Sequence, residues 1–148
     1  MTTFSSYMSD DHHRCDELFA AAEAAVEGGD WSSAMVAHRR FIEGMQHHFA
    51  MEEEVLFPAF EEASGSTMGP TVVMRHEHEQ MRQLFGEMDQ AVEEQQADDY
   101  LGASETLLIL MQQHNAKEEQ ILYPMTDQML EAQQSGLLAK MQGIGKVG

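Results

Sequence analysis

The feature that most constrains this chain is a His-x-x-x-Glu pattern that occurs twice, as His48 with Glu52 and as His114 with Glu118. A spacing of four places both side chains of each pair on one face of a helix. The offset between the two copies also relates further pairs, namely Met8 and Met74, His12 and His78, Leu18-Phe19 and Leu84-Phe85, and Met45 and Met111. Because no gap interrupts the offset, we interpret the chain as two copies of one helical hairpin.

Apolar residues recur at steps of three, four and seven, which is the pattern of helices with one buried face. The predicted helices cover residues 5–27, 31–62, 71–95 and 99–131. Gly28 is expected to end the first helix and Asp30 to cap the second. Pro58 and Pro124 are expected to kink or break the second and fourth helices, the former near Phe57, because proline lacks an amide donor.

Four helices with short connections pack best as an up-down-up-down bundle. We therefore predict an all-α four-helix bundle of two repeated hairpins, forming a single domain over residues 1–148. The first hairpin is assigned to 5–63 and the second to 70–132. Residues 1–4 are expected to be a loose tail, and residues 133–148 to form at most a short helical turn before fraying.

Composition excludes several classes of protein. The formal net charge of −18 argues against nucleic acid and anionic membrane surfaces, because both would repel the chain. No apolar run reaches transmembrane length, and no signal peptide is visible. Cys15 is the single cysteine, so no internal disulfide is expected and the predicted location is the cytoplasm.

Six ionisable residues fall on the apolar faces: His12, His48, Glu52, His78, His114 and Glu118. Burying each of these groups without a partner would cost roughly several kcal/mol of folding free energy. His12 precedes the turn at Gly28 and Gly29, and His48 follows it. At about 1.5 Å per residue, both lie roughly 24–28 Å from this turn, and the repeat brings the second hairpin's set to the same level. Histidines and glutamates meeting there from four helices predict a dinuclear metal site.

The doubled pattern resembles the hemerythrin-like, HHE cation-binding family over about residues 5–130. The resemblance lies in Asp11-His12, His48-x-x-x-Glu52, Glu77-His78 and His114-x-x-x-Glu118, with Leu-Phe-Pro and Leu-Tyr-Pro following. It implies a hemerythrin-like bundle that holds two iron ions as an oxo- or hydroxo-bridged di-iron centre. By this resemblance the four histidines are iron ligands and the two glutamates bridge the metals.

The sequence departs from the oxygen-carrying members at two points. Those members have a fifth histidine in a His-x-x-x-His pattern on the third helix, whereas Met74 and Arg82 stand at the positions four before and four after His78. Their second bridging acid stands five positions after its histidine, whereas Glu118 stands four after His114. The resemblance therefore implies an open position on each iron and reaction with oxygen in place of reversible carriage.

The function implied is binding of, or reaction with, a small diatomic ligand such as oxygen or nitric oxide, or with peroxide, in redox or oxygen sensing or in defence. Iron storage or donation, iron–sulfur cluster repair, and a structural metal-bound interaction bundle are the alternatives. A protein partner for iron or signal transfer is expected, with no nucleic acid and no membrane. The sequence shows no nucleophile or phosphate loop, so the only enzymatic expectation is a weak oxidase or peroxidase activity.

The remaining histidines and the methionines have plainer interpretations. His13, His47 and His76 lie off the apolar faces and are predicted at the surface or between helices, with His13 or His76 as substitute ligands the alternative. His38 is about 15 Å along the axis from His48 and is predicted to be a core residue. The four methionines of the repeat are predicted to pack in the core, or else to line a pocket for a diatomic molecule.

Two further sets of acids flank the predicted ligands. Asp11 and Glu77 are expected to be solvated, with a role as partners of the histidines or as an iron entry path the alternative. Glu53 and Glu119 lie about 100° around the helix from the predicted bridges, so their replacement is expected to lower metal retention much less than replacement of Glu52 or Glu118. Glu53 is also expected to face solvent.

Overall fold

The computed structural model describes residues 2–144, and in that range every regular element is helical. The helices are α1 (Phe4–Glu27), α2 (Trp31–Met51), α3 (Phe57–Ser64), α4 (Pro70–Glu93), α5 (Ala97–Lys117), α6 (Tyr123–Met129) and α7 (Gln134–Gly143). Two π-helical segments, Glu52–Leu56 and Glu118–Leu122, join α2 to α3 and α5 to α6, and a 3-10 turn, Glu131–Gln133, precedes α7. The described chain is therefore a bundle of four long helical rods with an additional C-terminal helix.

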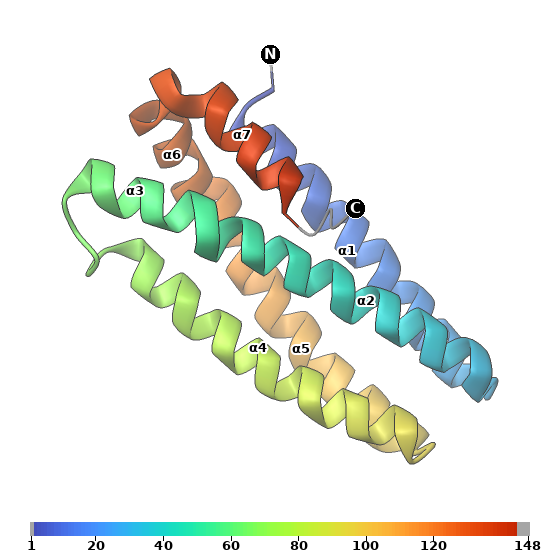
Figure 1. Ribbon diagram of the computed structural model, residues 1–148. Helices are drawn as coiled ribbons and strands as arrows, with labels where there is room; N and C mark the ends of the chain where they lie inside the picture. The colour runs from blue at the N-terminus through green and yellow to red at the C-terminus, as the bar shows by residue number, and fades with distance from the viewer. Residues whose placement is uncertain (1, 145–148) are drawn as a thin grey trace.

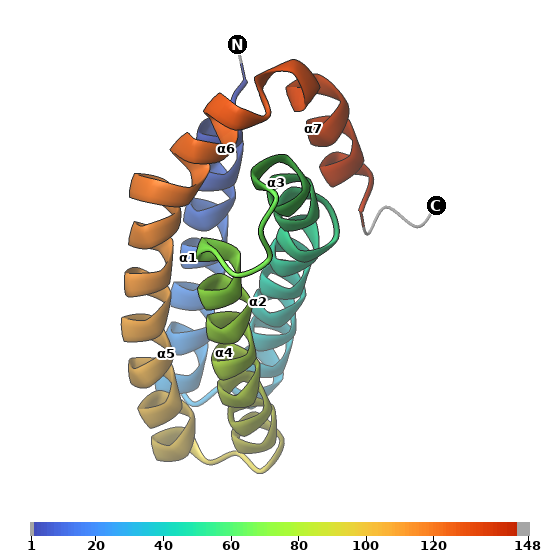
Figure 2. The ribbon, with the colours of Figure 1, turned by 90° about the vertical axis from the view of Figure 1, so that its left-hand side faces the viewer.

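The rods pair in chain order. Helix α1 packs along α2, and α4 packs along α5, as two hairpins whose turns lie at the same end of the molecule (Figure 1). Contacts of α2 with α4 and of α1 with α5 close the bundle, and Figure 2 shows the four rods side by side. The predicted all-α bundle of two hairpins is confirmed.

The helix ends follow from local chemistry. Thr3 and Ser6 form a reciprocal capping box at the start of α1. Gly28 ends α1, Gly29 has a φ of +76°, and the side chain of Asp30 accepts from the amide of Ser33 at 3.2 Å, as the glycine and aspartate predict. The expectation of a loose tail through residue 4 is wrong, because helix α1 begins at Phe4.

Asp127 ties that first turn to the other hairpin. Its carboxylate accepts from the amide of Phe4 at 2.7 Å and from the hydroxyl of Ser5 at 2.5 Å. The Phe4 side chain is fully buried. The start of α1 is therefore fixed by α6, a contact between helices that are distant in the sequence.

The two prolines do not break their helices. Pro58 and Pro124 fall in the first turns of α3 and α6, where a missing amide donor is tolerated. The wide π turns lie directly before them, and α2 runs on into α3 as one rod (Figure 1). The predicted kink or break near Phe57 is therefore replaced by a local widening of the helix.

These π segments change which residues face the core. Ile121 lies three positions after Glu118, where the 3.6-residue period predicts a buried side chain, but it is 56% exposed. Leu122 and Tyr123 are buried in its place. The extra residue in a π turn rotates the chain after Glu118 relative to the 3.6-residue period, which the sequence pattern does not reveal.

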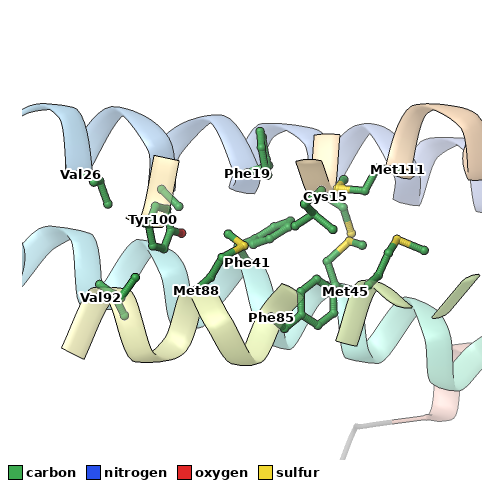
Figure 3. Packing of buried hydrophobic residues seen from close by; sticks show 14 of the residues in the cluster. Cys15, Phe19, Val26, Phe41, Met45, Phe85, Met88, Val92, Tyr100 and Met111 are labelled. Carbon is green, nitrogen blue, oxygen red and sulfur yellow. The ribbon is translucent and has the colours of Figure 1, made fainter. Parts of the chain in front are cut away.

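Two apolar clusters fill the bundle on either side of a polar layer. The larger cluster lies toward the hairpin turns and includes Phe19, Phe41, Phe85 and Tyr100, which come from all four rods (Figure 3). The smaller cluster lies at the other end and includes Phe57 with residues of α1, α4, α6 and α7. The polar layer between the clusters holds the six ionisable residues of the repeat.

Helix α7 differs from the tail expected after residue 132. It is ten residues long, and its buried side chains Leu137, Leu138 and Met141 pack in the smaller cluster. His47 of α2 donates from Nε2 to the carbonyl oxygen of Ile144 at 2.8 Å and holds the end of α7. The predicted fraying of residues 145–148 lies outside the described residues.

Candidate metal centre

The four rods bring all six predicted residues into one buried layer. Each has no more than 4% of its surface exposed. Glu52, His78, His114 and Glu118 place one ligand atom each within 4.8 Å of one another, and so do His12, His48 and Glu118. Because Glu118 belongs to both groups, the layer consists of two adjoining half-sites that share a carboxylate.

The Nε2 atoms of the four histidines face the two inner carboxylates. His12 Nε2 lies 3.0 Å and His114 Nε2 lies 3.2 Å from Oε1 of Glu118. Around Glu52, the Nε2 atoms of His78 and His48 lie 3.1 and 3.5 Å from Oε1. Each carboxylate thus stands between a histidine on the same helical rod and one from another rod.

An outer carboxylate holds the Nδ1 atom of every one of these histidines. Glu119 accepts from His12 at 2.6 Å and Glu53 accepts from His78 at 2.6 Å. Asp11 accepts from His48 at 2.7 Å and Glu77 accepts from His114 at 2.8 Å. These bonds fix each ring with Nε2 directed inward, as second-sphere carboxylates do for metal-binding histidines.

These four contacts correct two expectations. The prediction that Glu53 faces solvent is wrong, because Glu53 and its counterpart Glu119 each reach across to a histidine of a neighbouring helix. Asp11 and Glu77 are likewise not simply solvated but are the partners of His48 and His114. The pairing obeys the repeat, since the offset between the two hairpins carries each contact of one onto a contact of the other.

Tyr123 is a member of the layer that the sequence analysis missed. Its hydroxyl donates to Oε2 of Glu52 at 2.8 Å and contacts Oε1 of Glu118 at 2.9 Å, and it lies 3.2 Å from Nε2 of His12. In an α-helix a residue five positions after Glu118 would point about 140° away from it. The π turn removes this difference in direction, and Leu-Tyr-Pro in place of Leu-Phe-Pro was the only signal in the sequence.

The pKa values of His12, His114 and Glu52 in this layer are shifted upward. Burial lowers the pKa of His12, but the bonds to Glu118 and Glu119 outweigh it and raise the pKa to about 9. Burial also lowers the pKa of His114, but the interactions with Glu118 and Glu77 outweigh it and raise the pKa to about 10. Burial and the adjacent charge of Glu118 raise the pKa of Glu52. Metal binding to these histidines must therefore displace protons.

The pKa values of two outer carboxylates, Asp11 and Glu53, shift in the opposite direction, downward. Burial raises the pKa of Asp11, but hydrogen bonds from His48 and Arg14 lower it to about 2. Burial likewise opposes the shift at Glu53, where His78 and Arg82 lower the pKa to about 2. Both outer carboxylates are therefore ionised at neutral pH and favour positive charge in the layer.

The donor atoms fit a metal. Four of them are buried and make no hydrogen bond of good geometry, although three lie close to an oppositely charged group: Oε1 of Glu52, Nε2 of His78, Nε2 of His114 and Oε2 of Glu118. Buried polar atoms left unpaired are rare in proteins and call for a bound group. Imidazole nitrogens and carboxylate oxygens together suit a divalent transition metal.

The other predicted residues lie apart from this layer. His13 and His76 are exposed, and His38 is buried between Tyr100 and Asp89, with contacts of 2.8 and 2.5 Å. The predicted surface and core positions of these histidines are confirmed. All four methionines of the repeat are buried, two in each apolar cluster, and they therefore bracket the polar layer: Met8, Met45, Met74 and Met111.

The fold and the layer together define a helical-bundle protein with a buried histidine and glutamate site for cations. The model of the hemerythrin HHE cation binding domain matches residues 3–126, and the chain therefore belongs to this family. Searches of the curated proteins and of the solved structures gave no match. None of the helices in residues 2–144 combines the length and the hydropathy needed to cross a membrane.

Proposed function

We propose that the chain is a non-haem di-iron protein whose centre binds or reacts with a small molecule such as oxygen, nitric oxide or peroxide. The observation that carries this proposal is the pair of adjoining half-sites, each with two inward histidine nitrogens, joined by Glu52 and Glu118. In the proposal His12 and His48 hold one iron, His78 and His114 hold the other, and the two glutamates bridge them.

The choice of iron is supported by the chemistry of the donors. Each half-site offers two histidines and carboxylate oxygens, a set typical of non-haem iron with positions left for a further ligand. Cys15 lies in the larger apolar cluster and is not among the residues of either half-site. Bridging carboxylates from a helical bundle are also the usual frame of di-iron sites.

When bound, such a pair of irons supplies redox chemistry at a small-molecule ligand. The chain's own residues set the conditions for it. The four outer carboxylates keep the histidine rings fixed, and the two apolar clusters exclude water from both ends of the layer. The hydroxyl oxygen of Tyr123 lies within 3.4 Å of Nε2 of both His12 and His48, so it holds a proton next to one half-site.

The test is metal analysis combined with an optical spectrum. Protein produced with ample iron should contain about two iron ions per chain, as di-iron bundles do. Its reduced, anaerobic spectrum should change on addition of air and of nitric oxide, and the His48→Ala variant should lose both metal and response.

Other outcomes separate the alternatives. A folded protein that contains almost no metal, and whose metal-free form takes up no iron, contradicts the proposal. If a chelator removes the iron readily and the spectrum does not change on addition of air or nitric oxide, the chain is assigned to iron storage or donation. A tightly held metal that neither responds nor leaves assigns it to a structural role.

A further inference from the structure

One groove reaches the polar layer from the surface. It lies between α1 and α5, has a volume of about 520 Å³, and is lined at its inner end by His12 and Glu119. Its lining also includes the polar side chains of His13, Asp16 and Asn115. Among the described residues that line this groove there is no lysine or arginine.

The repeat allows a direct comparison with the other side of the bundle. The offset that carries His12 onto His78 relates three groove residues to residues of α2, α4 and the first π segment: Asp16 to Arg82, Asn115 to Phe49 and Glu119 to Glu53. On the opposite side of the bundle, the cationic Arg82 therefore stands at the position of the acidic Asp16, and the aromatic Phe49 stands at the position of Asn115. These exchanges break the symmetry that the six inner residues keep.

Arg82 and Phe49 close the equivalent approach to His78. The guanidinium of Arg82 donates to Glu53 at 2.9 Å and to Gln46 at 3.2 Å, and lies 5.2 Å from the centre of the Phe49 ring. That ring in turn stacks on His78, with 3.9 Å between the ring centres. A cation approaching His78 from this side meets the fixed positive charge of Arg82, and the Phe49 ring occupies the space in front of the imidazole.

The groove between α1 and α5 has the opposite character. The Glu119 side chain is 37% exposed, against 23% for Glu53, and its ion-pair partner within residues 2–144 is His12. Asp16 is exposed one helical turn after His12. His12, which lines the groove, contacts Oε1 of Glu118, and the other oxygen of that carboxylate, Oε2, is buried without a hydrogen-bond partner and is available to a cation.

We propose that divalent metal ions enter the centre through this groove, with Asp16 and Glu119 as transient ligands, and that Arg82 closes the matching path on the opposite side. This inference rests on the proposed function, because it requires that the six inner residues hold metal. A line of carboxylates in a concave channel concentrates cations and speeds their arrival. His12 lies between the groove and Glu118, so its half-site is the first that an entering ion reaches.

The experiment compares two charge reversals on α1. Metal-free protein and its Asp16→Arg and Glu17→Arg variants are mixed anaerobically with cobalt(II), and uptake is followed by absorbance. Both residues are exposed, and Glu17 lies outside the groove lining. Circular dichroism checks the fold, and elemental analysis gives the final metal content.

The expected result is a fall in uptake rate on the order of 10-fold for Asp16→Arg, with unchanged final content, and little change for Glu17→Arg. Equal slowing in both variants would assign the effect to net charge and overturn the route. An unchanged rate for Asp16→Arg, or a loss of final content in that variant, would overturn it too. A wild-type protein that takes up no metal at all would instead refute the proposed function itself.

Discussion

The hydroxyl of Tyr123 donates a hydrogen bond across the bundle to Oε2 of Glu52, at 2.8 Å. The residue related to it by the repeat is Phe57, whose ring centre lies 5.7 Å from that of His78 and which has no hydroxyl. The six inner residues are symmetric between the hairpins, but this oxygen lies beside the half-site of His12. The two half-sites are therefore chemically different.

The first prediction concerns this difference. We expect a chelator to remove two metal ions from the wild-type protein in two phases, with rates that differ roughly 10-fold, because a hydrogen bond to a charged group is worth about 1.5–3 kcal/mol. The Tyr123→Phe variant should bring the two rates closer together, while the groove beside His12 still distinguishes the half-sites. Release is followed by the absorbance of the chelator complex.

The control for this prediction is the double exchange Phe57→Tyr with Tyr123→Phe, which moves the hydroxyl to the other half-site. It should change the ratio of the two rates again, relative to the Tyr123→Phe variant. A single phase in the wild-type protein, or two unchanged phases in Tyr123→Phe, would show that the tyrosine does not distinguish the metal positions.

The second prediction uses three consecutive glutamates that face in three directions. Glu52 is an inner carboxylate, Glu53 holds His78 from outside, and Glu54 is exposed. The Glu52→Ala variant should lose stable metal binding. The Glu53→Ala variant should bind metal roughly 10–100-fold more weakly, because it loses the carboxylate that holds a ligand histidine in place. Glu54→Ala should leave metal binding unchanged.

The measurement is competition for cobalt(II) with a chelator of known affinity, with the fold of each variant checked by circular dichroism. Equal affinities for Glu53→Ala and Glu54→Ala would mean that the outer carboxylates do not support the site. Equal losses from Glu52→Ala and Glu53→Ala would mean that the inner and outer roles are not distinct.

The third prediction concerns the metal-free protein at alkaline pH. The pKa values of His12 and His114 rise from 6.5 to about 9 and about 10, because burial is outweighed by their carboxylate partners. A raised histidine pKa stabilises the fold fully below the unfolded value and loses that stabilisation as pH rises through the folded value. The free energy of unfolding should therefore fall from about pH 6.5, the unfolded value, to about pH 10.

Urea denaturation of chelator-treated protein across this range tests the sign. Metal-loaded protein is the control, and its stability should change less, since a metal in place of protons then balances the carboxylates. An unfolding free energy that rises over the same interval in the metal-free protein would contradict the prediction.

The fourth prediction concerns helix α7. Met141 is fully buried in the smaller apolar cluster, so Met141→Ala should lower the free energy of unfolding by about 2–5 kcal/mol. Lys140→Ala, an exposed neighbour on the same helix, should change it by less than about 0.5 kcal/mol. Urea denaturation of the metal-loaded proteins measures both, and equal stabilities would show that α7 does not pack on the bundle.

The sequence by itself determined the two hairpins and the level of the polar layer. The repeat and the 3.6-residue period give the face of each helix, and the rise per residue gives the height of each side chain above the turn. These two quantities were sufficient to bring His12 and His48 together with their counterparts His78 and His114. They depend on the chain's own helices and on nothing that neighbouring helices decide.

Only the tertiary structure decided which groups surround those residues. The contacts of Glu119 with His12 and of Asp11 with His48 join different helices, and a periodic pattern carries no information about the spacing between helices. The π turn that directs Tyr123 inward leaves no periodic signal either, because it changes the period itself. For the same reason the groove beside Asp16, and its closed counterpart at Arg82, became visible only when the four rods were placed side by side.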